Sequence, residues 1–173
     1  MTRTATLTLL AALTPACVLT PALGDVWTVS PTDEPLLQAA RAAAESWCQA
    51  SDGEYCPTIG PVGRPIRRRS LPGRRLGTYW SAWIEVDATD LLSGAQTLYA
   101  RDDTVCRTRQ AVHAPEGVEG CYRAATPAEA LQAVVAHELG HAAGLGHLPA
   151  RDALLASPGG WAIVPTATDV AAL

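Results

Sequence analysis

Two stretches of the sequence carry apolar residues at the three- and four-residue spacing of an amphipathic helix. The first has a start signal, because Thr32 or Asp33 can cap it and Pro35 suits its first turn. Its apolar face consists of one leucine, several alanines and a tryptophan: Leu36, Ala40, Ala43, Ala44 and Trp47. We therefore expect a helix here that packs this face on a core.

The second stretch begins at a stronger signal. Thr126, Pro127 and Glu129 match the N-cap, the first helical residue and the capping-box partner of a helix. Gly144 is a natural stop, since glycine favours the residue just after a helix. The apolar residues between them are Leu131, Val134, Val135 and Leu139. This is the clearest helix that the sequence predicts.

Alternation of apolar and polar residues predicts strands elsewhere. The segment 79–87 alternates throughout, with Trp80, Ala82, Ile84 and Val86 on one face. Shorter strands are expected at 26–29, 98–100 and 121–123. From Ser51 to Gly77, repeated Pro and Gly predict irregular chain. We interpret its basic part, Arg64 to Arg75, as a solvated surface loop, with recognition of an acidic ligand or substrate as the alternative.

Strands followed by a capped helix favour an α/β or α+β layered domain. The length of 173 residues suits one domain, and 48% hydrophobic residues allow a sizeable core. Phe is absent, so five Trp and the aliphatic residues must fill that core. The net charge of −4 gives no reason to expect nucleic acid as a partner. We expect a monomer.

The N-terminus has the features of an export signal. Arg3 is the only charged residue before Asp25, and the stretch ends in the small-x-small pattern Ala22-Leu23-Gly24. We expect residues 1–24 to be a cleaved signal peptide and 25–173 a secreted or periplasmic domain. Lipoprotein processing at Cys17 is the alternative, and it alone would tie the mature chain to a membrane.

Cysteine usage agrees with export. Cys48, Cys56, Cys106 and Cys121 remain after the signal, and four cysteines allow three pairings. The pairs that close the shortest loops, Cys48–Cys56 and Cys106–Cys121, are the disulfides that we predict. Zinc ligation by cysteine is the competing interpretation, but the chain has no C-x-x-C pair.

The candidate chemistry lies on the second helix, where the chain reads HELGHAAGLGH from His137 to His147. His137 and His141 are four residues apart, so both rings project from one helical face. Gly144 then permits a sharp turn that can bring His147 back to the same metal. Surface histidines with no metal are the alternative. His113, the fourth histidine, receives no role.

Three nitrogen ligands leave the fourth position of Zn²⁺ open for water, as in catalytic sites. Glu138 adjoins the first ligand and is placed to act as the general base on that water. The pattern predicts peptide-bond hydrolysis through a zinc-activated water, with one catalytic zinc and a protein or peptide substrate. Whether structural Ca²⁺ is also bound stays open.

HELGHAAGLGH resembles the extended zinc signature of the metzincin metallopeptidases, and Gly-Leu-Gly-His is most similar to the matrixin branch. The resemblance implies a zinc endopeptidase with a twisted mixed sheet, one antiparallel edge strand, two long helices and a small C-terminal subdomain. Leu155 takes the place of the Met-turn methionine, and the segment 165–170 is similar to the start of the family's last helix. Two alternatives stay open: a zinc-binding pseudoenzyme that serves as an interaction module, and an amidase acting on cell-wall peptide.

Overall fold

The computed structural model of the chain describes most of the expected domain. The described residues are 25–73, 75–93, 98–108, 111–112, 120–151, 153–156 and 162–173. The expected signal peptide, residues 1–24, lies outside them, as do Cys17 within it and His113.

Five strands form one mixed sheet with the order β2-β1-β3-β5-β4. Neighbouring strands are parallel except β4, which runs antiparallel to β5 at one edge. The strands are β1 (Val26–Thr28), β2 (Thr58–Ile59), β3 (Arg64–Arg68), β4 (Gly77–Trp80) and β5 (Trp83–Val86). The mixed α/β class and the antiparallel edge strand that the sequence led us to expect are confirmed.

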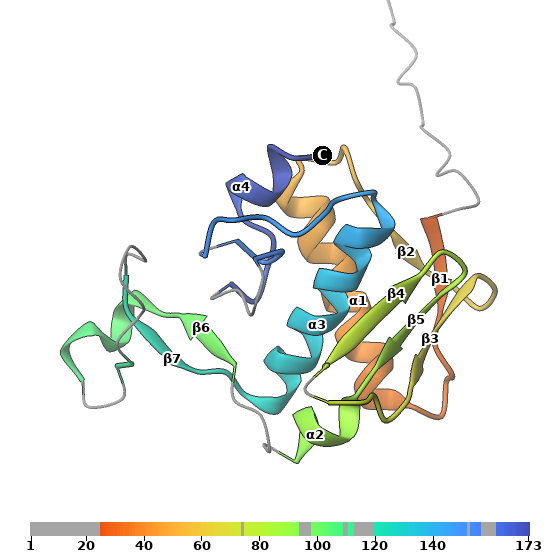
Figure 1. The fold of residues 1–173 in the computed structure, drawn as a ribbon, viewed down its shortest axis with the longest axis horizontal. Helices are drawn as coiled ribbons and strands as arrows, with labels where there is room; N and C mark the ends of the chain where they lie inside the picture. The colour runs from red at the N-terminus through yellow and green to blue at the C-terminus, as the bar shows by residue number, and fades with distance from the viewer. Residues whose placement is uncertain are drawn as a thin grey trace, which may run out of the picture.

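Two long helices, α1 (Glu34–Ala50) and α3 (Pro127–Ala142), lie side by side against the sheet (Figure 1). Both begin at the predicted caps, Asp33 and Thr126, and Thr126 forms a complete capping box with Glu129. The apolar face predicted for α1 is buried, and the Trp47 indole on it donates a hydrogen bond of 2.7 Å to the Ala136 carbonyl of α3. Packing between the two helices therefore fixes where α3 lies.

The segment 79–87 is not the single strand that its alternation predicted. It forms a hairpin in which β4 pairs with β5 from Gly77↔Val86 to Trp80↔Trp83. The two residues between the strands, Ser81 and Ala82, lack the Asn-Gly type of turn signal that would have marked the reversal. The reversal places Tyr79 opposite Ile84 on the inner face, whereas Trp80 is half exposed.

The prediction of a basic surface loop is also wrong in its first part, because Arg64–Arg68 is the central strand β3. Its middle residue, Ile66, is buried, and the arginines around it are held by acceptors on other elements. Arg67 and Arg69 both donate to the same Glu85 oxygen, at 2.9 and 3.1 Å, and Arg68 pairs with Asp33. Pairing with distant carboxylates lets so basic a sequence occupy a sheet.

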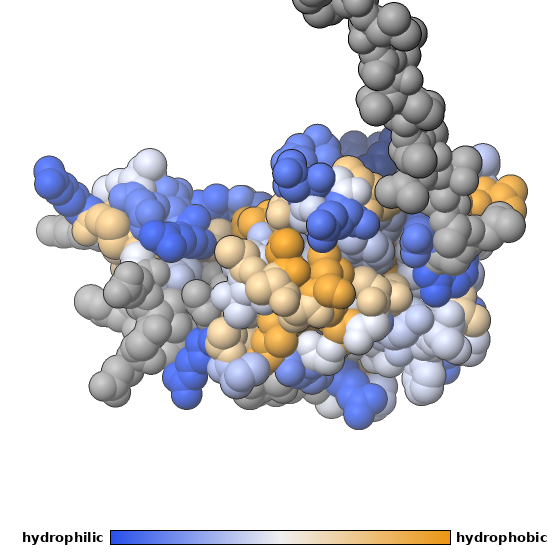
Figure 2. All heavy atoms as spheres, turned by 90° about the horizontal axis from the view of Figure 1, so that it is seen from above, coloured by the Kyte–Doolittle hydropathy of each residue, from blue (hydrophilic) through white to orange (hydrophobic). Residues whose placement is uncertain are grey.

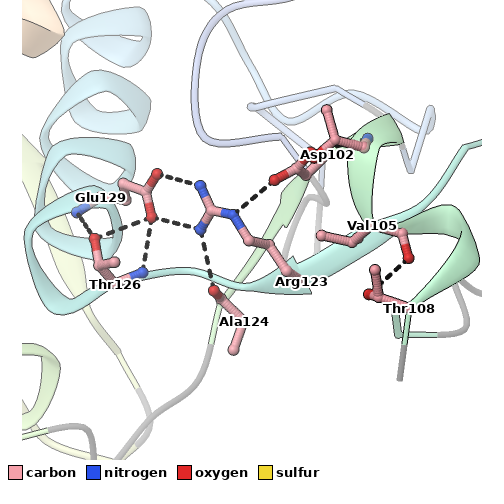
Figure 3. A network of polar contacts seen from close by, with 8 residues as sticks. Asp102, Val105, Thr108, Arg123, Ala124, Thr126 and Glu129 are labelled. Carbon is pink, nitrogen blue, oxygen red and sulfur yellow. Dashed lines mark hydrogen bonds and ion pairs between the residues drawn. The ribbon is translucent and has the colours of Figure 1, made fainter. Parts of the chain in front are cut away.

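A second, two-stranded sheet of β6 (Tyr99–Arg101) and β7 (Tyr122–Ala124) lies on the other side of α3 from the large sheet (Figure 1). Arg123, in β7, joins this small sheet to the start of α3 (Figure 3). Its guanidinium donates to both carboxylate oxygens of Glu129, at 2.8 and 2.6 Å, and to Asp102 at 3.1 Å. The remaining elements are α2 (Ala88–Leu92), the 3-10 helix η2 (Asp103–Arg107) and α4 (Ala167–Val170).

Both predicted disulfides are present: Cys48–Cys56 joins the last turn of α1 to the chain that follows it, and Cys106–Cys121 lies beside the small sheet. They point to an oxidising, extracellular type of environment. Among the described residues, no helix is long and apolar enough to cross a membrane.

Apolar side chains gather in the middle of the face drawn in Figure 2, which is the side where α3 ends and α4 lies in Figure 1. Val164 and Leu173, both from the C-terminal segment, are 42% and 45% exposed. The C-terminal segment therefore leaves part of its apolar surface in contact with solvent.

Candidate metal centre

The end of α3 determines where the three histidines lie. Gly144 adopts φ of 94°. Its N–H donates to the carbonyl of His141, and the N–H of Leu145 donates to the carbonyl of Gly140. This pair of hydrogen bonds is a Schellman motif, which reverses the chain directly after the helix. A residue with a Cβ would be strained at this φ, so glycine lets His147 return to the helix end.

The three imidazoles converge on one point. The Nε2 atom of His137 lies 3.1 Å from that of His141 and 3.3 Å from that of His147. One ligand atom from each ring lies within 4.8 Å of those of the other two. The prediction that these three residues come together is thus confirmed as geometry.

Backbone carbonyls orient two of the rings. The Nδ1 atom of His137 lies 2.9 Å from the Leu154 carbonyl oxygen, and that of His141 lies 2.8 Å from the Leu145 oxygen. A carbonyl only accepts, so each Nδ1 carries the proton and each Nε2 presents a lone pair to the common point. Fixing this tautomer is what a metal ligand requires.

Burial lowers the pKa of two of the imidazoles, His137 and His147. It lowers the pKa of His137 to about 4, and the neighbouring His141 and His147 act in the same direction. The pKa of His147 is also lowered, first by burial and then by His141. A lowered pKa favours the neutral imidazole, which does not have to lose a proton before it binds a cation.

The donor set fits a metal ion. Three converging imidazole nitrogens suit a transition metal such as zinc and not the oxygen-seeking Ca²⁺ or Mg²⁺. Three protein ligands also leave a coordination position for water or substrate. The group of His137, His141 and His147 can therefore hold a metal ion.

Glu138 lies on α3 between two of these histidines but points to the edge strand β4. It is 5% exposed, and burial raises the pKa of its carboxyl group to about 7. A hydrogen bond with the Tyr79 backbone acts in the opposite direction. A carboxyl group that titrates near neutral pH suits proton transfer in both directions.

Leu155 occupies a buried position next to α3. It is 0% exposed, and a methyl group built on Gly140 would lie 3.0 Å from its two terminal carbons. Gly140 directly precedes His141, so Leu155 packs closely against the helical turn that carries this ligand. An apolar role for Leu155 agrees with this packing.

Asp169 supports the segment that orients His137, and the sequence analysis assigned it no role. Its carboxylate is 0% exposed and accepts hydrogen bonds from the backbone N–H groups of Leu154 and Leu155, both at 2.9 Å. Thr166 donates to the same group. The Thr-x-x-Asp pattern of residues 166–169 was the available signal, because it matches a helix capping box.

Comparisons with protein-family models, with curated proteins and with solved structures found no match to the chain. The function is therefore inferred from the residues of the site and from the motif that they form.

Proposed function

We propose that the protein is a zinc-dependent endopeptidase, with zinc held by His137, His141 and His147 and with Glu138 as general base. One observation carries the proposal: three imidazole nitrogens converge at the end of α3, the helix that also carries the buried carboxyl group of Glu138. A structural zinc site would use four protein ligands and would need no base.

The histidines would hold zinc through Nε2, with Leu154 and Leu145 fixing the orientation of two rings. Zinc, when bound, supplies Lewis acidity that polarises a carbonyl group and lowers the pKa of water. Glu138 then accepts a proton from the attacking water and passes it to the nitrogen of the leaving amine. Burial of Glu138 matches this double role, because its pKa of about 7 makes both proton transfers accessible.

A metzincin-like fold is part of the same proposal. Support comes from the mixed sheet with its antiparallel edge strand, the two long helices and the apolar residue at position 155. The disulfides agree with a protein that is exported to meet its protein or peptide substrates.

Metal analysis of ligand variants tests the centre. We expect purified protein to bind one zinc, and each of His137→Ala, His141→Ala and His147→Ala to lose most of it because two nitrogens hold zinc far more weakly. Atomic absorption after dialysis measures this. Full occupancy in His147→Ala would show that the third ligand lies elsewhere.

Glu138→Gln separates the chemistry from metal binding. The amide keeps the size of the side chain but cannot accept the proton, so zinc should stay bound while casein hydrolysis falls by about a hundredfold or more. Full activity in this variant would remove Glu138 from the mechanism. A zinc-loaded wild type that cleaves neither casein nor a peptide library would favour the pseudoenzyme, and cleavage of cell-wall peptide alone would favour the amidase.

A further inference from the structure

Gly77, the first residue of β4, has no conformational reason to be glycine. Its φ is not among the positive values found at Gly53, Gly73, Gly120 and Gly144. It pairs regularly with Val86 in the antiparallel ladder. Glycine weakens a strand, and inside one it often marks a place where another group approaches closely.

The group that approaches Gly77 is the Glu138 side chain. A methyl group built on Gly77 would lie 2.5 Å from Oε1 of Glu138 and 2.9 Å from its Cγ. The same methyl group would lie 2.8 Å from Cγ1 of Val134, one turn earlier on α3. A β-branched side chain such as Val134 is stiff in a helix. Val134 therefore would not readily move to make room for a displaced Glu138 side chain.

Two residues later, the same strand binds this carboxyl group. The backbone of Tyr79 forms a hydrogen bond with Glu138, which lowers the pKa of this carboxyl group. The edge strand β4 thus offers space at Gly77 and a backbone donor at Tyr79. Together they hold the carboxyl group where α3 alone would leave it free to choose other rotamers.

We propose that Gly77 is a positioning residue for Glu138: the missing side chain leaves the space that the carboxyl group needs to sit between α3 and β4. This inference rests on the proposed role of Glu138 as general base. Gly77 lies sixty-one positions before Glu138 in the sequence and on a different element. The position of the general base thus depends on β4 as well as on α3.

A double-mutant cycle on unfolding tests the contact without reference to activity. Gly77→Ala should lower the folding equilibrium constant of zinc-loaded protein by about tenfold or more, as an overpacked methyl group does. The loss should be similar with Gln at position 138, which has the same size. With Glu138→Ala it should shrink to about threefold or less, the remainder coming from Val134. If Gly77→Ala lowered the folding equilibrium constant equally with Glu and with Ala at position 138, the inference would be overturned.

Turnover measurements test whether the contact matters for catalysis. Gly77→Ala should keep its zinc and its KM while kcat falls by about a hundredfold, since displacing a catalytic group by about 1 Å can cost that much. The matched control is Gly60→Ala, also without positive φ, where a methyl group would meet Val26 at an ordinary 3.4 Å. Its kcat should stay unchanged. Full kcat in Gly77→Ala would overturn the positioning role. A zinc-loaded wild type without activity would overturn the proposed function, and the unfolding cycle would then decide whether the contact exists.

Discussion

Single residues of the metal centre depend on backbone groups that come from other parts of the chain. His137 is oriented by the carbonyl of Leu154, whose own N–H is held by Asp169. Leu155, the next residue, donates its N–H to the same carboxylate and places its side chain against Gly140. A buried carboxylate, two peptide groups and one leucine thus form a continuous support beneath one face of α3.

The first prediction at this scale concerns Leu155. Leu155→Met should change stability by less than about 1.5 kcal/mol, because the two side chains have nearly the same volume. Leu155→Ala should open a cavity at a fully buried position and lower the free energy of unfolding by about 2–5 kcal/mol. Denaturant unfolding measures both, and zinc affinity should fall only for the Ala variant.

The outcome for the Met variant is decisive for the packing argument. If Leu155→Met raised the peptidase rate a hundredfold, an apolar side chain of the right volume would not be all that position 155 requires. The methionine sulfur or a different side-chain shape would then have to contribute to activity.

At the scale of elements, α3 is fixed at both ends by side chains and by turn geometry. Its N-terminus has a capping box, and its C-terminus has a Schellman turn that carries His147 back. Arg123 adds a third restraint by joining the small sheet to Glu129 in the first turn (Figure 3). A helix held in this way keeps its ligands in a constant register.

The restraint at Glu129 predicts a pH dependence of stability. The hydrogen bonds from Arg123 hold the pKa of Glu129 down to about 2, below its ordinary value of 4.5. A carboxyl group with a lowered folded-state pKa stabilises the fold fully above pH 4.5, and this contribution is lost as the pH falls towards 2. Glu129→Gln removes the charge at every pH.

The free energies of unfolding of wild type and Glu129→Gln should therefore differ most above pH 4.5 and converge as the pH falls towards 2. Urea unfolding at a series of pH values measures this difference. Glu45→Gln on the exposed side of α1 is the control. A difference in free energy of unfolding between wild type and Glu129→Gln that stays constant over the whole pH series would contradict the role given to Arg123.

At the scale of the whole molecule, one disulfide lies close to the metal-bearing helix and the other lies in the small sheet. Cys48–Cys56 closes the turn after α1, and Tyr55 within that turn donates its hydroxyl to the Leu139 carbonyl of α3 at 2.9 Å. Cys106–Cys121 joins η2 to the start of β7. The two bonds should therefore affect the metal centre differently.

Replacing both cysteines of either pair by alanine should lower the free energy of unfolding by about 2–3 kcal/mol, because each disulfide closes a short loop. Zinc affinity should fall more when Cys48 and Cys56 are replaced, since the anchor of Tyr55 on α3 loosens. Denaturation and zinc titration measure the two effects. A larger loss of zinc affinity from the Cys106 and Cys121 pair would contradict this assignment.

The sequence by itself determined the elements whose signals are local. The caps and apolar faces of α1 and α3, the spacing of the three histidines and the short-loop cysteine pairs all depend on residues within about fifteen positions of one another. Such signals can be found along the chain, because helix periodicity and loop closure act at short range.

The tertiary structure alone decided how these elements support one another. Arg64–Arg68 became a central strand because Glu85 and Asp33 neutralise its arginines, and neither partner lies nearby in the sequence. The contact of Gly77 with Glu138 and the support that Asp169 gives to the segment holding His137 have the same origin. Each depends on burial and hydrogen bonding between separate elements, which a linear pattern does not encode, since those contacts exist only once the chain has folded.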